Sequence, residues 1–198
     1  VNVSYNFFKE KASKIKERKK MEFIFEKAVQ KDREEIWKVM KEAAQTVKKK
    51  EWFAAGDEAY IQEVMEGEGF IILAREKESR ELAGFFIVVV PGEEDYMGVY
   101  ADVPKEDTDK IVHMDTAAVK SSFRGNKLQQ KMLEKAEEEL VQRMKEKQHT
   151  VQYRLCSVHP ENTFSLFNMT ENGYEIKVRT QLYGGLERFV LCKKTVLI

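Results

Sequence analysis

The sequence contains little cysteine, no net charge and no long apolar run. It has 2 cysteines, and 34 basic residues balance 34 acidic ones. Cys156 and Cys192 do not have the spacing of a metal site, so we expect buried, reduced thiols, no metal and a cytoplasmic protein. A zero net charge is not typical of a dedicated nucleic-acid-binding protein.

The apolar runs are too short to cross a bilayer. The longest, such as residues 85–90, fall far below the roughly 20 residues that a transmembrane helix needs. The pattern of a secretory leader is not found near residue 1, so we expect none. A hydrophobic share of 42% and a charged share of 34% are typical of a globular chain. We therefore expect neither a membrane nor a nucleic acid as partner.

Residues 1–20 differ in composition from the rest of the chain. Seven basic residues stand there against Glu10 and Glu17. We interpret this segment as a basic N-terminal extension ahead of a domain at residues 21–198. A solvated helix or tail explains the charge, and a surface for an anionic partner is the alternative. An adaptor for nucleic acid is the remotest interpretation.

From residue 21 onward, strand and helix patterns alternate. Strands are expected at residues 22–29, 70–75, 82–90, 111–119, 150–158, 174–182 and 187–196, and helices at 32–47, 57–66, 126–147 and 162–171. The order β-α-α-β-β-β-α-β-α-β-β predicts an α/β (α+β) protein with a mixed central sheet and helices packed on it. Residues 91–110 form an acidic loop, which would favour a cationic ligand or is merely solvated.

The stretch SSFRGNKLQQ, residues 121–130, lies between a strand that ends at Val119 and a long helix. The first four N–H groups of a helix have no partner within it and carry the positive end of its dipole, where a phosphate fits. Gly125 leaves room for a ligand, and Arg124 and Lys127 add positive charge. The Walker and dinucleotide-binding glycine patterns are both absent, so spacing alone leaves a plain strand-turn-helix as the alternative.

Residues 111–142 resemble the cofactor-binding motif of the GNAT family, the acetyl-CoA-dependent N-acetyltransferases. That motif reads Arg/Gln-x-x-Gly-x-Gly/Ala and follows a strand that ends in Val or Ile five residues earlier, as Val119 does here. Lys127 replaces the first glycine, and Gln129 replaces the second small residue. The resemblance implies acetyl-CoA as acetyl donor, held by Ala117, Ala118, Val119, Arg124, Gly125, Asn126, Lys127, Leu128 and Gln129.

A second motif supports the resemblance. Asn162, followed by Ser165 and by Gly173-Tyr174, is similar to the last motif of the family, which reads Asn-x-x-Ala, a helix, then Gly-Phe/Tyr. In the family this asparagine contacts the pantetheine arm, so the resemblance implies that role for Asn162, with a helix N-cap as the structural alternative. The two motifs imply the GNAT fold over residues 21–198, similar to bacterial members with a His-Met-Asp-Ser/Thr strand and a Tyr-Gly-Gly hairpin.

The reaction of the family is a direct attack of a neutral amine on the thioester, which needs a base. His113 and Asp115 lie two residues apart in the strand at 111–119. Because strand side chains alternate, we expect both on one face, together with Ala117 and Val119. We expect His113 or Asp115 to move the proton, unless the pair only satisfies hydrogen bonds within the sheet.

The reaction also needs a proton donor and a pocket for the acceptor. Many family members have a tyrosine seven residues after the motif asparagine, but Met169 stands there and cannot donate a proton. Tyr183 is the substitute candidate, with packing as its alternative role. Trp52, Phe53 and Tyr60 are expected to line the acceptor pocket or to pack in the core.

The sequence therefore predicts an N-acetyltransferase that transfers the acetyl group of acetyl-CoA to a primary amine of a small molecule or peptide. The alternative is a catalytically weak GNAT-fold module that binds acyl-CoA as a sensor or partner-binding protein. Lys127 and Met169 favour this module, whereas the pair of His113 and Asp115 favours the enzyme. The identity of the acceptor, and the choice between a monomer and a homodimer, are not decided by the sequence.

Overall fold

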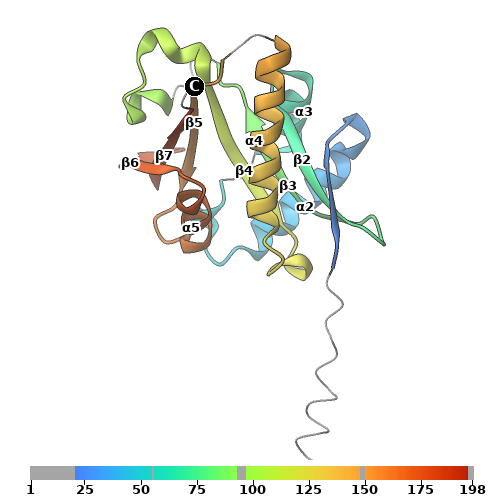
Figure 1. The fold of residues 1–198 in the computed structure, drawn as a ribbon. Coiled ribbons are helices and arrows are strands. Elements are labelled where there is room, and N and C mark those ends of the chain that lie inside the picture. Colours follow the sequence, from blue (N-terminus) through green and yellow to red (C-terminus); the bar gives the residue numbers. More distant parts are fainter. Residues whose placement is uncertain (1–20, 55, 93–96, 148–149, 196–198) are drawn as a thin grey trace, which may run out of the picture.

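A computed structural model describes residues 21–54, 56–92, 97–147 and 150–195. The predicted basic extension at residues 1–20 lies outside the described residues. A seven-stranded sheet in the order β1-β2-β3-β4-β5-β7-β6 forms the centre, and helices lie on both of its sides (Figure 1). The predicted mixed sheet with packed helices is confirmed. Within the described residues, no helix is long and apolar enough to cross a membrane.

The elements follow the predicted order. The strands are β1 Phe23–Lys27, β2 Phe70–Glu76, β3 Leu82–Val89, β4 Ile111–Val119, β5 Tyr153–Val158, β6 Glu175–Leu182 and β7 Leu186–Lys194. The α-helices are α2 Arg33–Thr46, α3 Glu58–Glu66, α4 Leu128–Lys147 and α5 Thr163–Glu171. Short 3₁₀ helices at Met97–Ala101 and Lys105–Lys110 lie within the predicted acidic loop.

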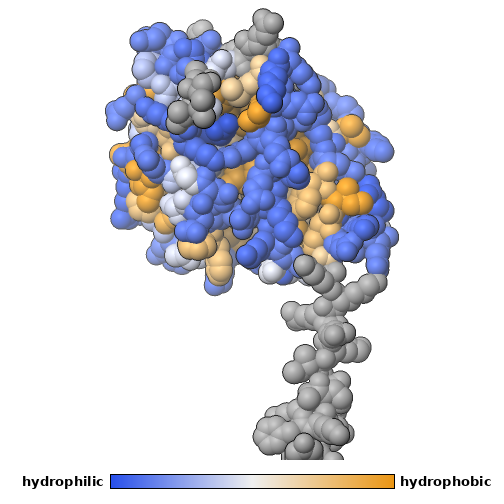
Figure 2. Space-filling model, viewed as in Figure 1, coloured by the Kyte–Doolittle hydropathy of each residue, from blue (hydrophilic) through white to orange (hydrophobic). Residues whose placement is uncertain are grey.

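Each face of the sheet has its own core. α4 packs on one face through Met132 and Leu133, which are fully buried. α2 and α3 pack on the other face through Ile36, Met40 and Ile61. The outward side of α4 is covered by hydrophilic residues (Figure 2), as expected of an amphipathic helix on a sheet. The strands β2 and β3 are therefore buried on both faces, and a ligand reaches the centre of the sheet where neighbouring strands leave room.

Such room exists between β4 and β5. The two strands pair in parallel over three residues only, Ile111–His113 with Tyr153–Leu155. Both strands run on, β4 to Val119 and β5 to Val158, while β4 stays paired with β3 and β5 with β7. The centre of the sheet therefore opens, and backbone groups of a central strand become accessible to a ligand.

β4 also contains a bulge beside this opening. Between Ala117 and Met114, the pairing advances by three residues on β4 but by only two on β3. Asp115 and Thr116 thus share a single opposite residue. A bulge of this kind bends the strand and redirects its side chains.

The bulge corrects one prediction. Regular alternation would place His113 on the same face as Ala117 and Val119. Instead, Ala117 and Val119 pack together with Met114 in the core beneath α4, because the extra residue reverses the alternation. The predicted common face, which also included Asp115, is therefore wrong.

Arg75 ties the first elements to the sheet. Its guanidinium contacts the carboxylates of Glu26 and Asp32, each at 2.9 Å, and that of Glu35 at 2.7 Å. Arg75 and Asp32 are each 8% exposed. Asp32 also accepts a hydrogen bond from the Val29 N–H at 2.9 Å, just before α2 begins. One buried cation thus connects β1, β2 and the start of α2.

Replacing this cation tests its contribution to stability. Arg75→Ala leaves Asp32 buried without its partner, so we expect the free energy of unfolding to fall by about 3 kcal/mol. Urea unfolding measures this change. Arg179→Ala removes an exposed arginine paired with Glu187 and is the control, whose unfolding midpoint should barely move. Equal losses in the two variants would contradict the structural role given to Arg75.

Candidate functional site

Two clefts open where β4 and β5 separate. The first has a volume of about 810 Å³, and the second has a volume of about 440 Å³. The two share six lining residues, which are Trp52, Phe53, Ala117, Gln129, Asn162 and Ser165. The clefts therefore adjoin, with Ala117 of β4 at their junction.

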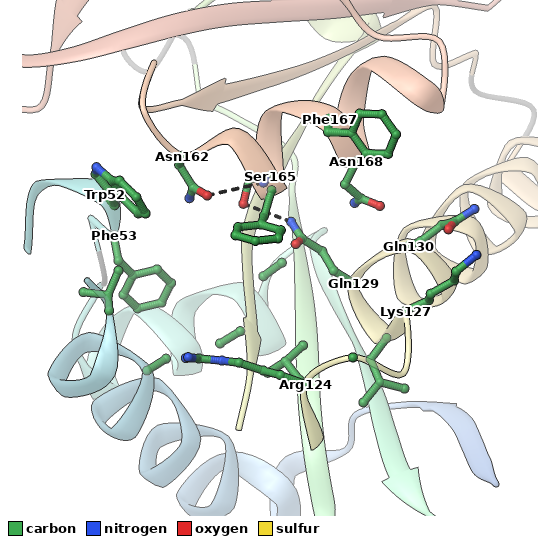
Figure 3. Close-up of a pocket in the computed structure, with 18 of the residues that line it drawn as sticks. Trp52, Phe53, Arg124, Lys127, Gln129, Gln130, Asn162, Ser165, Phe167 and Asn168 are labelled. Atoms are coloured by element: carbon green, nitrogen blue, oxygen red, sulfur yellow. Dashed lines mark hydrogen bonds between the residues drawn. The ribbon is translucent and has the colours of Figure 1, made fainter. Parts of the chain in front are cut away.

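The first cleft lies between the end of α2, the loop before α4, and α5 (Figure 3). All but one of the predicted cofactor residues line it, namely Ala117, Ala118, Val119, Arg124, Gly125, Lys127, Leu128, Gln129 and Asn162. The exception is Asn126, whose side-chain amide turns back to the Phe123 carbonyl oxygen at 2.9 Å. Asn126 thus stabilises the turn before α4.

The loop before α4 adopts the left-handed conformation at two residues. The φ angle is 87° at Gly125 and 57° at Lys127. Lys127 stands where the motif has its first glycine, so the backbone keeps a glycine-like conformation although the residue carries a Cβ. The first hydrogen bond of α4 runs from the Lys131 N–H to the Lys127 carbonyl at 3.1 Å. The N–H groups of residues 128–130 therefore have no helical acceptor and point out of the helix end.

Positive charge surrounds this helix end. Lys48, Arg124 and Lys127 line the first cleft, against Glu171 as the lining carboxylate. The Arg124 side chain extends toward α2 (Figure 3) and lies 3.3 Å from the Thr46 hydroxyl. Cationic side chains and unpaired N–H groups at one helix end can hold phosphate groups.

Asn162 connects the first cleft to α5. Its Oδ1 accepts a hydrogen bond from the Ser165 N–H at 3.3 Å, and the Ser165 hydroxyl in turn accepts one from Gln129 Nε2 at 3.3 Å (Figure 3). Asn162 is therefore an N-cap. The cap uses the oxygen, so the amide N–H₂ can still donate to a ligand. The two predicted roles of Asn162 are compatible.

The floor of the opening is the backbone of β4. The Lys120 N–H donates to the Ala83 carbonyl of β3 at 2.9 Å. Because successive N–H groups of a strand point in opposite directions, those of Val119 and Ala117 are turned away from β3 and toward the opening. These two N–H groups can donate to a ligand that lies between β4 and β5.

Two aromatic residues of the first cleft were missed by the sequence reasoning. Phe164 and Phe167 of α5 line it, and they are 75% and 66% exposed. Their spacing of three residues places both on one side of the helix. A pair of apolar residues on the solvent side of a short helix was the signal that could have identified them.

The second cleft passes through the opening in the sheet. Its walls include Met114 and Met169 from the core beneath α4 and Tyr60, which packs against the core of α2 and α3. Trp52 and Phe53 also line it. The three residues predicted for acceptor binding therefore lie together in one cleft.

Asp115 is an exposed carboxylate in the second cleft. Its Oδ2 accepts hydrogen bonds from the Tyr60 hydroxyl and, at 2.7 Å, from the Thr116 hydroxyl. Both bonds use one oxygen, so Oδ1 can accept from a further donor. His113 is 2% exposed and lines neither cleft. The structure brings Asp115 to the cleft and leaves His113 inside the sheet.

The opposite side of the second cleft carries two hydroxyls and a cation. The Tyr183 hydroxyl lies 2.9 Å from the Ser157 hydroxyl, and the Arg188 guanidinium lies 5.6 Å from the centre of the Tyr183 ring. Arg188 is 2% exposed, and burial lowers its pKa. The sequence reasoning missed Arg188, although its place on the buried side of β7 made it an unusual residue.

Cys156 lines the second cleft as a buried thiol. Burial raises its pKa, so the sulfur stays protonated at neutral pH and is not a nucleophile. Cys192 is also free and buried, which confirms the prediction of buried thiols. Among the described residues, no cluster of His, Cys, Asp and Glu could hold a metal ion.

Comparison with solved structures identifies the architecture. A GNAT-family acetyltransferase from Listeria monocytogenes is 19% identical with a TM-score of 0.62, over 87% of this chain and 95% of that chain. One from Streptococcus pneumoniae is 14% identical with a TM-score of 0.63, over 88% and 100%. The chain has the GNAT fold.

Another solved structure with this fold contains a bound ligand. A Salmonella typhimurium protein in a structure with its cofactor acetyl-CoA is 12% identical with a TM-score of 0.63, over 87% of this chain and 94% of that chain. No family model and no curated protein matches the sequence. The GNAT fold predicted from the two motifs is nevertheless confirmed, and these motifs form facing walls of the first cleft.

The left-handed conformation of Lys127 gives a test of the loop. An L-residue in the left-handed conformation destabilises the folded state by roughly 1–2 kcal/mol. A glycine avoids this strain but lowers stability by about 0.4–1 kcal/mol, because it increases the conformational entropy of the unfolded chain. We therefore expect Lys127→Gly to raise the free energy of unfolding by about 0.5 kcal/mol. Lys127→Val, which is β-branched, should lower it instead. Urea unfolding of both variants is the measurement, and a less stable glycine variant would show that the loop has another conformation.

Proposed function

We propose that the protein is an N-acetyltransferase, with acetyl-CoA in the first cleft and a primary amine of a small molecule or peptide in the second. The observation that supports this proposal is the junction of the two clefts at Ala117, inside the opening between β4 and β5. A thioester from one cleft and an amine from the other can meet there. Substrates held in reacting geometry gain a large entropic advantage.

The first cleft suits the phosphates and the pantetheine arm of acetyl-CoA. Its phosphates would lie against the N–H groups at the start of α4 and beside Arg124 and Lys127. The pantetheine arm would follow the N–H groups of Val119 and Ala117 along β4, with the Asn162 amide on its other side. This arrangement extends the open edge of β4 in the manner of an added strand.

The second cleft supplies the groups for proton transfer. The amine must be neutral to attack, and Asp115 Oδ1 would accept its proton. The attack forms the C–N bond, and the Ala117 N–H would stabilise the oxyanion. The C–S bond then breaks, and Tyr183 is the candidate that returns a proton to the thiolate. His113 stays a prediction from the sequence, but we assign the base to Asp115 because only Asp115 lines the cleft.

Transfer is direct rather than through an acetylated enzyme. A covalent intermediate would need an activated nucleophile at the junction. Cys156 is the thiol of the second cleft, and its raised pKa keeps it protonated. The catalytically weak sensor is the alternative function. Lys127 favours it, since its Cβ narrows the site of the pyrophosphate.

Calorimetric titration with acetyl-CoA tests the cofactor site. We expect a micromolar dissociation constant, which Arg124→Ala should raise about 10-fold because a charged hydrogen bond is worth roughly 1.5–3 kcal/mol. Lys131→Ala is the control, since Lys131 is an exposed cation of the same helix that lines neither cleft. No binding by the wild type, or equal losses in both variants, would contradict the proposal.

A second test concerns the base. Asp115→Asn keeps the shape of the side chain but cannot take a proton, so we expect acetyl transfer to a panel of primary amines to fall about 100- to 1,000-fold. The affinity for acetyl-CoA should not change, because Asp115 does not line the first cleft. His113→Asn is the comparison. Should His113→Asn abolish transfer while Asp115→Asn remains active, the base would be His113.

A further inference from the structure

Arg188 is a buried cation without a carboxylate partner among the described residues. Its Nη1 donates to the Glu187 carbonyl oxygen at 2.7 Å. Its Nη2 is buried and has no hydrogen-bond partner among the described residues. In the part of the chain that the structure describes, no carboxylate lies within salt-bridge distance of this guanidinium. Arginine nevertheless keeps its charge in proteins.

Arg75 shows what a structural arginine looks like in the same molecule. Arg75 is 8% exposed and contacts three carboxylates. Arg188 is 2% exposed and contacts none among the described residues. An isolated buried charge is costly, and proteins rarely keep one without a partner. Arg154 is also buried and has no ion pair among the described residues, but it lines neither cleft. Because Arg188 lines the second cleft, we expect its missing partner to be a ligand.

The position of Arg188 in the second cleft indicates the chemical class of this ligand. Arg188 lines the second cleft together with Ser157 and Tyr183. The Ser157 hydroxyl lies 2.9 Å from the Tyr183 hydroxyl, and when Ser157 accepts in that bond it can donate its own proton to a ligand. A guanidinium and a hydroxyl that line one cleft can each donate to an oxygen of a carboxylate.

We propose that the acceptor carries a carboxylate in addition to its amine, and that Arg188 binds this carboxylate. The acceptor class is then the amino acids, with the amine at Asp115, the carboxylate at Arg188, and the apolar part against Met114 and Phe86 of the cleft wall. This inference rests on the proposed acetyl transfer. It disfavours acceptors with a simple cationic amine, which would leave Arg188 unpaired.

The test compares acids with their own amides. Each acid and its corresponding amide are supplied with acetyl-CoA in separate reactions. The acids are L-leucine, L-methionine and L-phenylalanine, together with β-alanine and 4-aminobutyrate, in which the amine lies farther from the carboxylate. Acetylated products are measured by mass spectrometry. For at least one distance between amine and carboxylate, we expect the acid to react with a kcat/KM roughly 10- to 100-fold above that of its amide. The reason is that the amide lacks the charged hydrogen bond to Arg188.

Arg188→Met links this preference to the residue. We expect KM for the preferred acid to rise roughly 10- to 100-fold, while its amide and the affinity for acetyl-CoA are unaffected. The variant should fold, because replacing an unpaired buried cation by an apolar side chain leaves no orphaned anion. Arg179→Met is the control, since Arg179 is an exposed arginine on β6 that lines neither cleft.

The outcomes separate this inference from the proposed function. Absence of acetyl-CoA binding in calorimetry would overturn the proposed function, and the inference with it. Binding of acetyl-CoA with amides used as well as acids would overturn the role of Arg188 alone. The wild-type comparison of acids with amides decides the question even if Arg188→Met does not fold.

Discussion

The separation of β4 from β5 after three paired residues is the constraint on which the site depends. A fully paired sheet that is covered by helices on both faces leaves no route to its centre. Here each strand stays paired on its other side, so the opening is held without loss of the sheet. Both clefts, the exposed N–H groups of β4 and the contact between the clefts at Ala117 follow from this single feature.

Two local irregularities place the chemistry around the opening. The bulge in β4 turns Asp115 into the second cleft and keeps Ala117 with the core beneath α4. The left-handed residue before α4 sets the direction in which the helix end faces the first cleft. Strain and irregularity at a site are stable when the rest of the fold holds them. The cluster around Arg75 is part of that support, since it joins β1 and α2 to β2.

Much of the fold could be predicted from the sequence, because helix and strand periodicity is a local property. The order of elements and the two motifs that line the first cleft are examples. The bulge could not be predicted, because one extra residue in a strand leaves no mark on an alternating pattern until its pairing with β3 is known. Arg188 could not be assigned to the site either, since its partner strand and cleft come together only through long-range pairing.

The proposed function depends most on acetyl-CoA lying along β4 in the opening. Backbone amide NMR of the ¹⁵N-labelled protein, titrated with CoA, tests it most directly. We expect the largest shift changes at the amides of Ala117 and Val119 and at residues 125–130. Changes confined to the β1, α2 and β2 region, or no saturable change, would contradict it.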